Sequence, residues 1–118
     1  MAYVDGFVLA VPKDKLDAYK VMAQLGAEVW MEYGALSYVE CFGDDVPYGE
    51  LTSFPRAVQA TEDEVVVFSW ITYTDRASRD AINAKVMADE RMNAYQPGNM
   101  PFDGKRMIYG GFQAFLER

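Results

Sequence analysis

Residues 64–73 have the sequence EVVVFSWITY, and residues 74–92 continue as TDRASRDAINAKVMADERM. Valine and aromatic residues dominate the first stretch, which is typical of a β-strand. Thr74 and Asp75 offer capping oxygens, and the good helix formers behind them predict a helix running to about Met92. A strand followed directly by a capped helix is half of a βαβ-like unit, and the rest of the chain repeats that pattern.

The order of strand, helix and strand is predicted twice. Residues 3–11 are apolar and β-branched, and apolar residues then recur at spacings of three and four up to Tyr33, with Gly34 as the stop. Residues 35–43 and 106–116 are the remaining predicted strands. This order predicts an α+β fold, a ferredoxin-like βαββαβ sandwich with a four-stranded antiparallel sheet and two helices on one face. It occupies one domain, residues 1–118.

The connection over residues 44–63 is far longer than a hairpin loop needs, and such loops are usually functional or locally structured. Ser53 as a cap, with Pro55 near the first helical position, predicts one short helical turn there.

Composition and charge exclude several classes of protein. The chain is 51% hydrophobic and 25% charged, the balance of a globular domain. Eleven basic and 18 acidic residues give a net charge of −7, which opposes binding to phosphate backbones. No apolar run approaches the roughly 20 residues of a membrane span, and the N-terminus lacks a signal-peptide pattern. We therefore expect a cytoplasmic protein with no nucleic-acid or membrane partner.

The chain has no histidine and one cysteine, Cys41. This excludes an intrachain disulfide, a cysteine-based zinc site and the Ser-His and Cys-His nucleophile pairs. Acid–base chemistry has to use carboxylates, tyrosine, lysine or Cys41, and we expect no cofactor.

Strand alternation sorts the predicted sheet residues into two faces. One face is almost wholly apolar, and we expect the two helices to cover it and to bury Cys41 as an unreactive thiol. Its residues are Val4, Val8, Val39, Cys41, Val66, Phe68, Trp70, Ile108 and Phe112. The other face mixes large apolar and polar groups, and we expect it to be open and to pair with a second copy in a homodimer. Its residues are Asp5, Phe7, Tyr38, Glu40, Val67, Ser69, Ile71, Tyr109 and Gln113.

Candidate site residues come from the mixed face and from the basic pair before the last strand. The catalytic candidates are Glu40, Tyr109 and Arg106, and the ligand-binding candidates are Asp5, Tyr38, Ser69, Lys105 and Gln113. A carboxylate in mid-strand needs a partner, and we expect Arg106 or a tyrosine hydroxyl beside Glu40. Arg106 and Lys105 can alternatively hold a small anion or neutralise nearby acids.

Other patterns have two interpretations each. The carboxylates of Glu40, Asp44, Asp45 and Asp5 can bind a cation or form a solvated acidic turn, and we predict no metal because the spacing matches no established ligand loop. Gly110-Gly111 indicates a bulge or the close approach of a ligand. The aromatic residues line a pocket or belong to the core: Trp30, Tyr38, Trp70 and Tyr109.

Four strings of sequence together suggest a family: residues 3–7, YVDGF; residues 39–47, VECFGDDVP; residues 67–70, VFSW; and residues 100–112, MPFDGKRMIYGGF. In these the chain resembles the YbaA-like family of small bacterial proteins whose function is not known. The resemblance spans nearly the whole chain. It implies the dimeric α/β-barrel superfamily, whose members include cofactor-independent monooxygenases, isomerases and haem enzymes, so the fold alone implies no reaction.

Two hypotheses about function remain open at this point. The chain is either a small-molecule-binding protein or cofactor-independent enzyme of unknown substrate, or a non-catalytic dimeric structural or interaction module. An enclosed cavity beside Glu40, Tyr109 or Arg106 favours the first hypothesis, and a filled interior favours the second.

Overall fold

The computed structural model describes all 118 residues and has the predicted order of elements. The strands are β1 (Tyr3–Pro12), β2 (Ser37–Phe42), β3 (Glu64–Tyr73) and β4 (Ile108–Gln113). The α-helices are α1 (Leu16–Glu32), α2 (Phe54–Ala57) and α3 (Arg76–Ala88), and the 3-10 helices are η1 (Lys13–Lys15), η2 (Glu90–Ala94) and η3 (Gly104–Arg106). None of the helices has the length and apolar character needed to cross a membrane.

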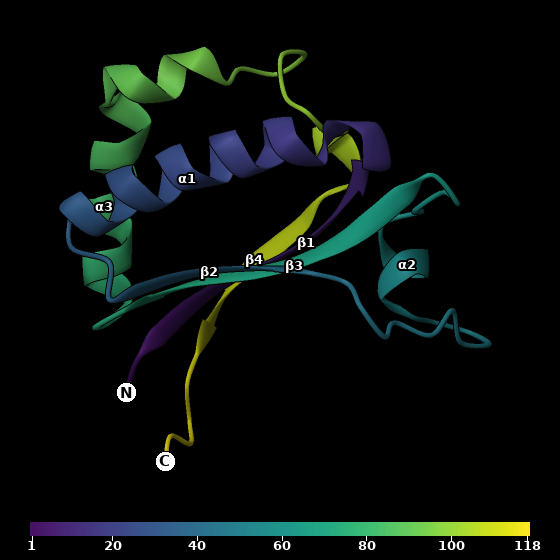
Figure 1. Cartoon of the computed structure of the whole chain (residues 1–118). Helices are drawn as coiled ribbons and strands as arrows, with labels where there is room; N and C mark the ends of the chain where they lie inside the picture. The colour runs from purple at the N-terminus through teal and green to yellow at the C-terminus, as the bar shows by residue number, and fades with distance from the viewer.

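The four strands form one antiparallel sheet in the order β2-β3-β1-β4. Helices α1 and α3 lie together on one side of this sheet, and the two chain ends lie close to each other (Figure 1). This is the arrangement of the ferredoxin-like sandwich, so the predicted fold class is confirmed.

Local capping explains where the elements end. α3 stops at Ala88 and not at Met92, because the extended Asp89 accepts a hydrogen bond from the Arg91 amide and caps η2 instead. In the same way Asp103 accepts from the Lys105 amide to form η3, and β4 therefore begins at Ile108 and not at Arg106. β4 ends at Gln113, three residues before the predicted end.

The long connection holds the predicted helical turn. The Ser53 side chain accepts a hydrogen bond from the Arg56 amide at 3.1 Å, and Pro55 lies in the first turn of α2. Phe54 packs on Phe68 of β3, so α2 lies on the face of the sheet opposite to α1 and α3 (Figure 1).

Two apolar clusters form the core between the sheet and the pair α1 and α3. In its larger cluster, Val29 of α1 and Ile82 and Val86 of α3 pack against Ile71 and Tyr73 of β3. A second cluster joins Tyr19 of α1 to Leu9, Val11 and Val67 of the sheet.

The helices cover the mixed face, so the prediction of which face they cover was wrong. Ile71 is only 3% exposed and Asp5 only 8%, whereas Phe68 on the opposite face is 44% exposed and Phe112 63%. The mixed face is covered because its polar side chains bind partners on the helices: Glu40 accepts from Tyr19 of α1, and Asp5 lies against Arg79 of α3. The apolar face has no polar side chains that need such partners. The homodimer face predicted through Phe7, Tyr38 and Ile71 is corrected accordingly.

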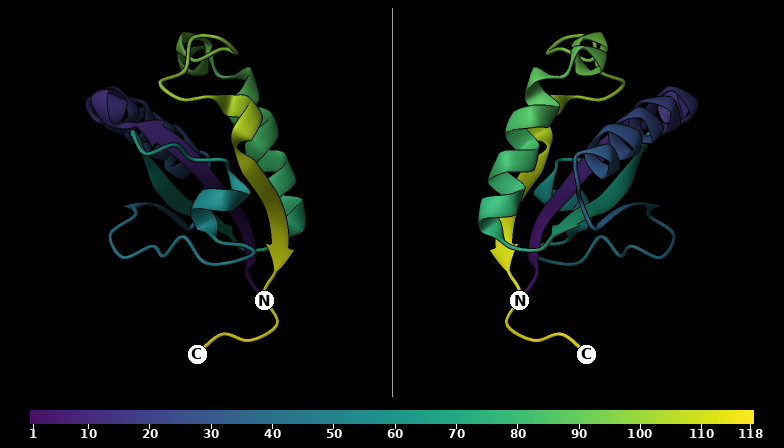
Figure 2. Two further views of the ribbon diagram at one scale, coloured as in Figure 1. Left: turned by 90° about the vertical axis from the view of Figure 1, so that its right-hand side faces the viewer. Right: turned by 90° about the vertical axis from the view of Figure 1, so that its left-hand side faces the viewer.

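We name the uncovered side the open face. It consists of Val4, Val8, Val39, Cys41, Phe68, Trp70, Ile108 and Phe112. Cys41 is half-buried on this face and not under the helices as predicted, because its register partner is Phe68. Figure 2 shows α2 and its flanking loop on this side of the sheet, whereas α1 and α3 lie on the other.

Candidate functional site

A cavity of about 620 Å³ lies between the sheet, α1 and α3. The sheet forms its floor, and α1 and α3 contribute residues such as Trp30 and Asn83. The segment from Met92 to Phe102 borders another side, and the cavity opens to solvent at Tyr109, which is 74% exposed. Figure 2 shows this segment passing above the sheet between the end of α3 and η3. The volume lies within the range of roughly 300–1,000 Å³ that is typical of ligand sites.

Strand register places four side chains of the floor in one row across the sheet. Glu40 of β2 lies opposite Ser69 of β3, Ser69 lies opposite Phe7 of β1, and Phe7 lies opposite Tyr109 of β4. All four line the cavity. Since neighbouring strands are about 4.8 Å apart, Glu40 and Tyr109 stand about 14 Å from each other at opposite edges of the floor.

Two tyrosine hydroxyls hold the Glu40 carboxylate. Tyr19 of α1 donates to Oε1 at 2.7 Å, and Tyr38 of β2 donates to Oε2 at 2.9 Å. The expectation that Glu40 pairs with a tyrosine is confirmed, whereas Arg106 is not its partner. We call Tyr19, Tyr38, Glu40 and Ser69 the Glu40 cluster.

Burial raises the pKa of Glu40 above the ordinary value of 4.5, and the hydroxyl groups of Tyr19, Tyr38 and Ser69 limit that rise by favouring the charged form. The pKa values of Tyr19 and Tyr38 are raised well above their usual range, first by burial and then by the neighbouring Glu40 charge. The cluster therefore presents a carboxyl group that takes up a proton more readily than usual, supported by two hydroxyls that keep theirs.

A missing side chain in α1 makes room for this cluster. A methyl group at Gly26 would lie 2.8 Å from the Tyr38 hydroxyl oxygen. Glycine in mid-helix costs about 1 kcal/mol relative to alanine, so the close approach of Tyr38 is the physical reason for a residue that α1 would otherwise disfavour.

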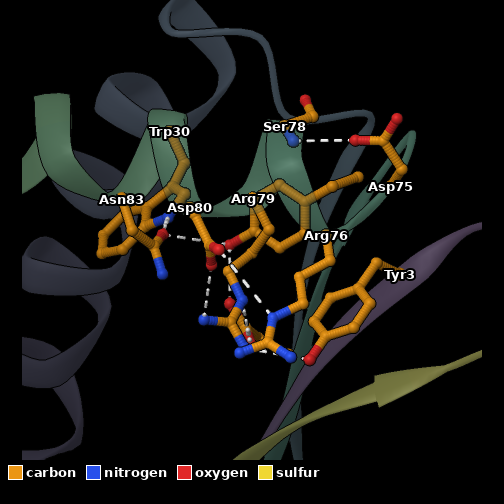
Figure 3. Close-up of polar contacts among 10 residues, drawn as sticks. Tyr3, Trp30, Asp75, Arg76, Ser78, Arg79, Asp80 and Asn83 are labelled. Carbon is orange, nitrogen blue, oxygen red and sulfur yellow. Dashed lines mark hydrogen bonds and ion pairs between the residues drawn. The ribbon is translucent and has the colours of Figure 1, made fainter.

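A second polar group, which we call the Asp5 network, lines another wall. Asp5 of β1 accepts from the Tyr73 hydroxyl at 2.9 Å, and the Arg79 Nε of α3 lies 3.3 Å from Asp5 Oδ1. Arg79 also donates to the Tyr3 hydroxyl at 3.1 Å and reaches from α3 toward β1 (Figure 3). Trp30 of α1 donates to Asn83 of α3, which ties the two helices together above this network (Figure 3).

The second glycine of the Gly110-Gly111 pair gives Arg79 its space. A methyl group at Gly111 would collide with the Arg79 guanidinium and the Tyr3 ring. β4 pairs with β1 without interruption through both glycines, so the expected bulge is absent and the close approach is made by side chains of the chain itself.

Three candidates lie away from the cavity lining. Arg106 binds the Glu64 carboxylate through two hydrogen bonds of 2.6 and 2.8 Å, and this pair holds the pKa of Glu64 down to about 2. Lys105 is exposed on η3. The Gln113 amide donates to the backbone oxygens of Met1 and Ala2 and ties the two chain ends together.

The acidic residues after β2 do not join Glu40. Asp44 and Asp45 are exposed in the turn, whereas Glu40 faces α1, and no group of three or more carboxylate, cysteine or histidine side chains is placed to hold a metal ion.

The helix residues of the site were not predicted from sequence. Tyr19, Arg79 and Asn83 complete the two polar groups, yet each has the pattern of an ordinary helix position. One signal was available: Gly26 lies on the apolar stripe of α1, one turn of helix from Trp30, and an unexplained glycine there indicates a close approach.

An antiparallel ferredoxin-like sheet with two helices over a partly polar cavity defines a class of small α+β proteins with a ligand-sized space between their layers. The family model described as "protein of unknown function (DUF1428)" matches residues 2–104, and the chain belongs to this family. The "uncharacterized protein YbaA" of Escherichia coli strain K12 is 56% identical to it over 117 residues, covering 99% of each chain. The YbaA relatives of Escherichia coli O157:H7 and Shigella flexneri match equally well, so the family resemblance is confirmed.

Solved structures share the fold at low sequence identity. A dimeric ferredoxin-like protein from an uncultured marine organism has a TM-score of 0.64 at 13% identity, covering 99% of this chain and 98% of its own. A NIPSNAP domain protein from Burkholderia xenovorans has a TM-score of 0.59 at 16% identity, with full coverage of both chains. SnoaB, a cofactor-independent oxygenase from Streptomyces nogalater, has a TM-score of 0.53 at 10% identity, covering 98% and 93%. At these identities the likeness concerns the fold alone.

Proposed function

We propose that this chain is a small-molecule-binding protein that acts as a cofactor-independent enzyme, with Glu40 accepting a proton from the bound substrate. One observation carries the proposal. A carboxyl group of raised pKa lies on the floor of a cavity large enough for an organic ligand, and this is the setting in which carboxylates serve as general bases.

The geometry leaves Glu40 free to react. An ionised carboxylate has about four acceptor positions. Tyr19 and Tyr38 each use one, on different oxygens, and the Ser69 hydroxyl takes a third, which leaves one for a substrate. A remaining lone pair takes a proton from an O–H or an acidic C–H group of the substrate, which becomes an anion while Glu40 becomes a neutral acid. The same proton can return to the substrate anion later in the cycle.

The two tyrosines act as positioning residues in this proposal. Because their pKa values are raised, both hydroxyls stay protonated and keep donating while the charge on Glu40 changes. They hold the carboxyl group in one orientation, and such preorganisation lowers the cost of proton transfer.

Proton transfer to a carboxylate uses no cofactor, and a neighbour in fold is described as a cofactor-independent oxygenase. The cavity beside Glu40 and Tyr109 also favours the enzyme or binding hypothesis over a non-catalytic module, since an interaction module has no need of such a space.

We also infer that two chains associate through the open face. Phe68, Ile108 and Phe112 are 44%, 46% and 63% exposed on one sheet surface, and contiguous apolar patches of this kind mark interfaces. A second copy is the favoured occupant because a neighbour in fold is described as dimeric. The cavity of each of the two copies then lies outside the interface, on the side of the sheet that α1 and α3 cover.

Deuterium exchange into a probe ketone tests the role of Glu40. β-Tetralone has an acidic C–H next to its carbonyl, and nuclear magnetic resonance can follow its exchange in D₂O with and without protein. We expect Glu40→Gln to lower the protein-dependent rate by about 100-fold, the lower end of a general base's contribution. The matched control is Glu28→Gln, which changes an exposed glutamate of α1 and should have no effect. Equal rates in wild type and Glu40→Gln would refute the proposal.

A further inference from the structure

The cavity has an unusual apolar lining. Five of the seven methionines of the chain line it, and they come from five different segments: Met22, Met87, Met92, Met100 and Met107. The lining comprises 25 of the 118 residues, so an even distribution would place only about one or two methionines there. The other two, Met1 and Met31, are exposed, and of the five lining residues Met87 is also exposed, at the rim of the cavity.

Valine shows the opposite distribution. The chain has 12 valines and none lines the cavity, although Val11, Val29, Val67 and Val86 are all fully buried in the core. Stiff branched valines thus fill many core positions, whereas flexible methionines supply most of the aliphatic lining of the cavity, beside Leu9 and Ile71. The difference is a property of the cavity and not of the protein interior in general.

The chemistry of methionine points to a class of ligand. Its thioether sulfur is polarisable and makes favourable contacts with aromatic rings, and its three rotatable bonds let it fit around flat molecules of varied outline. Aromatic side chains supply further ring partners, and Phe7 and Tyr109 already stack at a centroid distance of 6.4 Å on the floor.

The polar groups of the cavity restrict the ligand further. In the Asp5 network, Asp5 already accepts from Tyr73 and lies against Arg79, and Asn83 accepts from Trp30. Glu40 is the carboxylate of the lining that keeps capacity for a ligand. A single weakly acidic group on the ligand is therefore enough to satisfy the site.

We infer that the cavity takes a flat aromatic molecule with one weakly acidic hydroxyl or equivalent group directed at Glu40, and that the methionines select rings over aliphatic chains. This inference rests on the proposed function for the orientation of the acidic group. The preference for rings rests on the methionine lining alone.

Two alcohols with the same number of carbon atoms test the preference. β-Naphthol presents a fused ring and n-decanol a flexible chain, and calorimetry measures the binding of each to the full chain. We expect β-naphthol to bind more tightly. Met22→Leu and Met100→Leu should each weaken β-naphthol binding by about two- to tenfold, the range of one sulfur–aromatic contact, and leave n-decanol binding within twofold.

Matched controls separate the outcomes. Met31→Leu changes an exposed methionine of α1 outside the cavity and should leave both affinities unchanged. Equal binding of the two alcohols, or an unchanged preference in Met22→Leu and Met100→Leu, overturns the ring inference while the role of Glu40 stands. Absence of binding by both alcohols overturns the inference and the proposed function together. Ring preference with normal β-tetralone exchange in Glu40→Gln supports the ring inference and refutes only the role of Glu40.

Discussion

Replacing Gly26 by alanine tests the arrangement of the Glu40 cluster most directly. In an ordinary mid-helix position this change stabilises a protein, because alanine is the better helix former by about 0.8–1 kcal/mol. Here the new methyl group would lie 2.8 Å from the Tyr38 hydroxyl oxygen but 3.5 Å from the ring carbon that bears it, which is ordinary contact. Only the hydroxyl therefore opposes the substitution.

The structure allows the net effect to be worked out. To relieve the contact, Tyr38 has to move its hydroxyl away from Glu40 Oε2, and it packs on Trp30 at a ring-centroid distance of 6.0 Å, which resists such a shift. A hydrogen bond to a charged group contributes about 1.5–3 kcal/mol. Subtracting the gain in helix propensity leaves Gly26→Ala destabilising by about 0.5–2 kcal/mol.

A double-mutant cycle with Tyr38→Phe isolates the cause. Phenylalanine removes the hydroxyl and keeps the ring, so in that background Gly26→Ala should stabilise the protein by about 0.5–1 kcal/mol. Urea unfolding of the four proteins, at one protein concentration, measures each free energy of unfolding. If Gly26→Ala stabilised the wild-type protein as much as the Tyr38→Phe variant, the hydroxyl would not be confined by Gly26 and the reasoning would fail.

Three further predictions concern pH and assembly. Because the pKa of Glu40 is raised on folding, the folded state binds the Glu40 proton more tightly than the unfolded state does. The difference in free energy of unfolding between wild type and Glu40→Gln should therefore favour wild type most below about pH 4.5 and decrease as the pH rises through the folded pKa. A difference that does not change with pH in urea unfolding would contradict this. Glu64 has the opposite sign, since its pKa is lowered to about 2: Glu64→Gln should cost about 2 kcal/mol at neutral pH, and the cost should vanish as the pH falls from 4.5 through 2. Sedimentation should give about twice the 13.3 kDa chain mass for wild type and the single-chain mass for Phe112→Asp. A thiol reagent should label Cys41 faster in the variant than in wild type. A monomeric wild type would rule out the open face as an interface.

The order of elements was predictable because it depends on local patterns. Periodicity of two and of three to four, the Asp75 cap and the Ser53-Pro55 turn each specify structure within a few residues. The side of the sheet that the helices cover was not predictable, because it depends on contacts between residues that are distant in the chain. Asp5 meets Arg79 only after the chain has folded, and until then its face has the composition of a surface.

The candidate site was predictable to the same extent. Asp5, Tyr38, Glu40, Ser69 and Tyr109 line the cavity as a set because alternation along the strands places them on one face, whichever face that is. The helix partners require the rotation of each helix about its own axis, which a sequence pattern fixes only coarsely. Arg106 was misplaced because its partner Glu64 lies 42 residues away, beyond any local signal.

The two glycines that accommodate tyrosine hydroxyls have a consequence for how this family can vary. Gly26 faces the hydroxyl of Tyr38, and Gly111 faces that of Tyr3, so each glycine and its tyrosine occupy one shared volume. A lineage that gains a side chain at Gly26 has to give up the Tyr38 hydroxyl, whereas one that gains a side chain at Gly111 has to move both the Tyr3 ring and the Arg79 guanidinium. In each case the linked changes should be inherited together. A glycine at each of these two positions would thus indicate that a member of the family keeps the polar groups of the cavity.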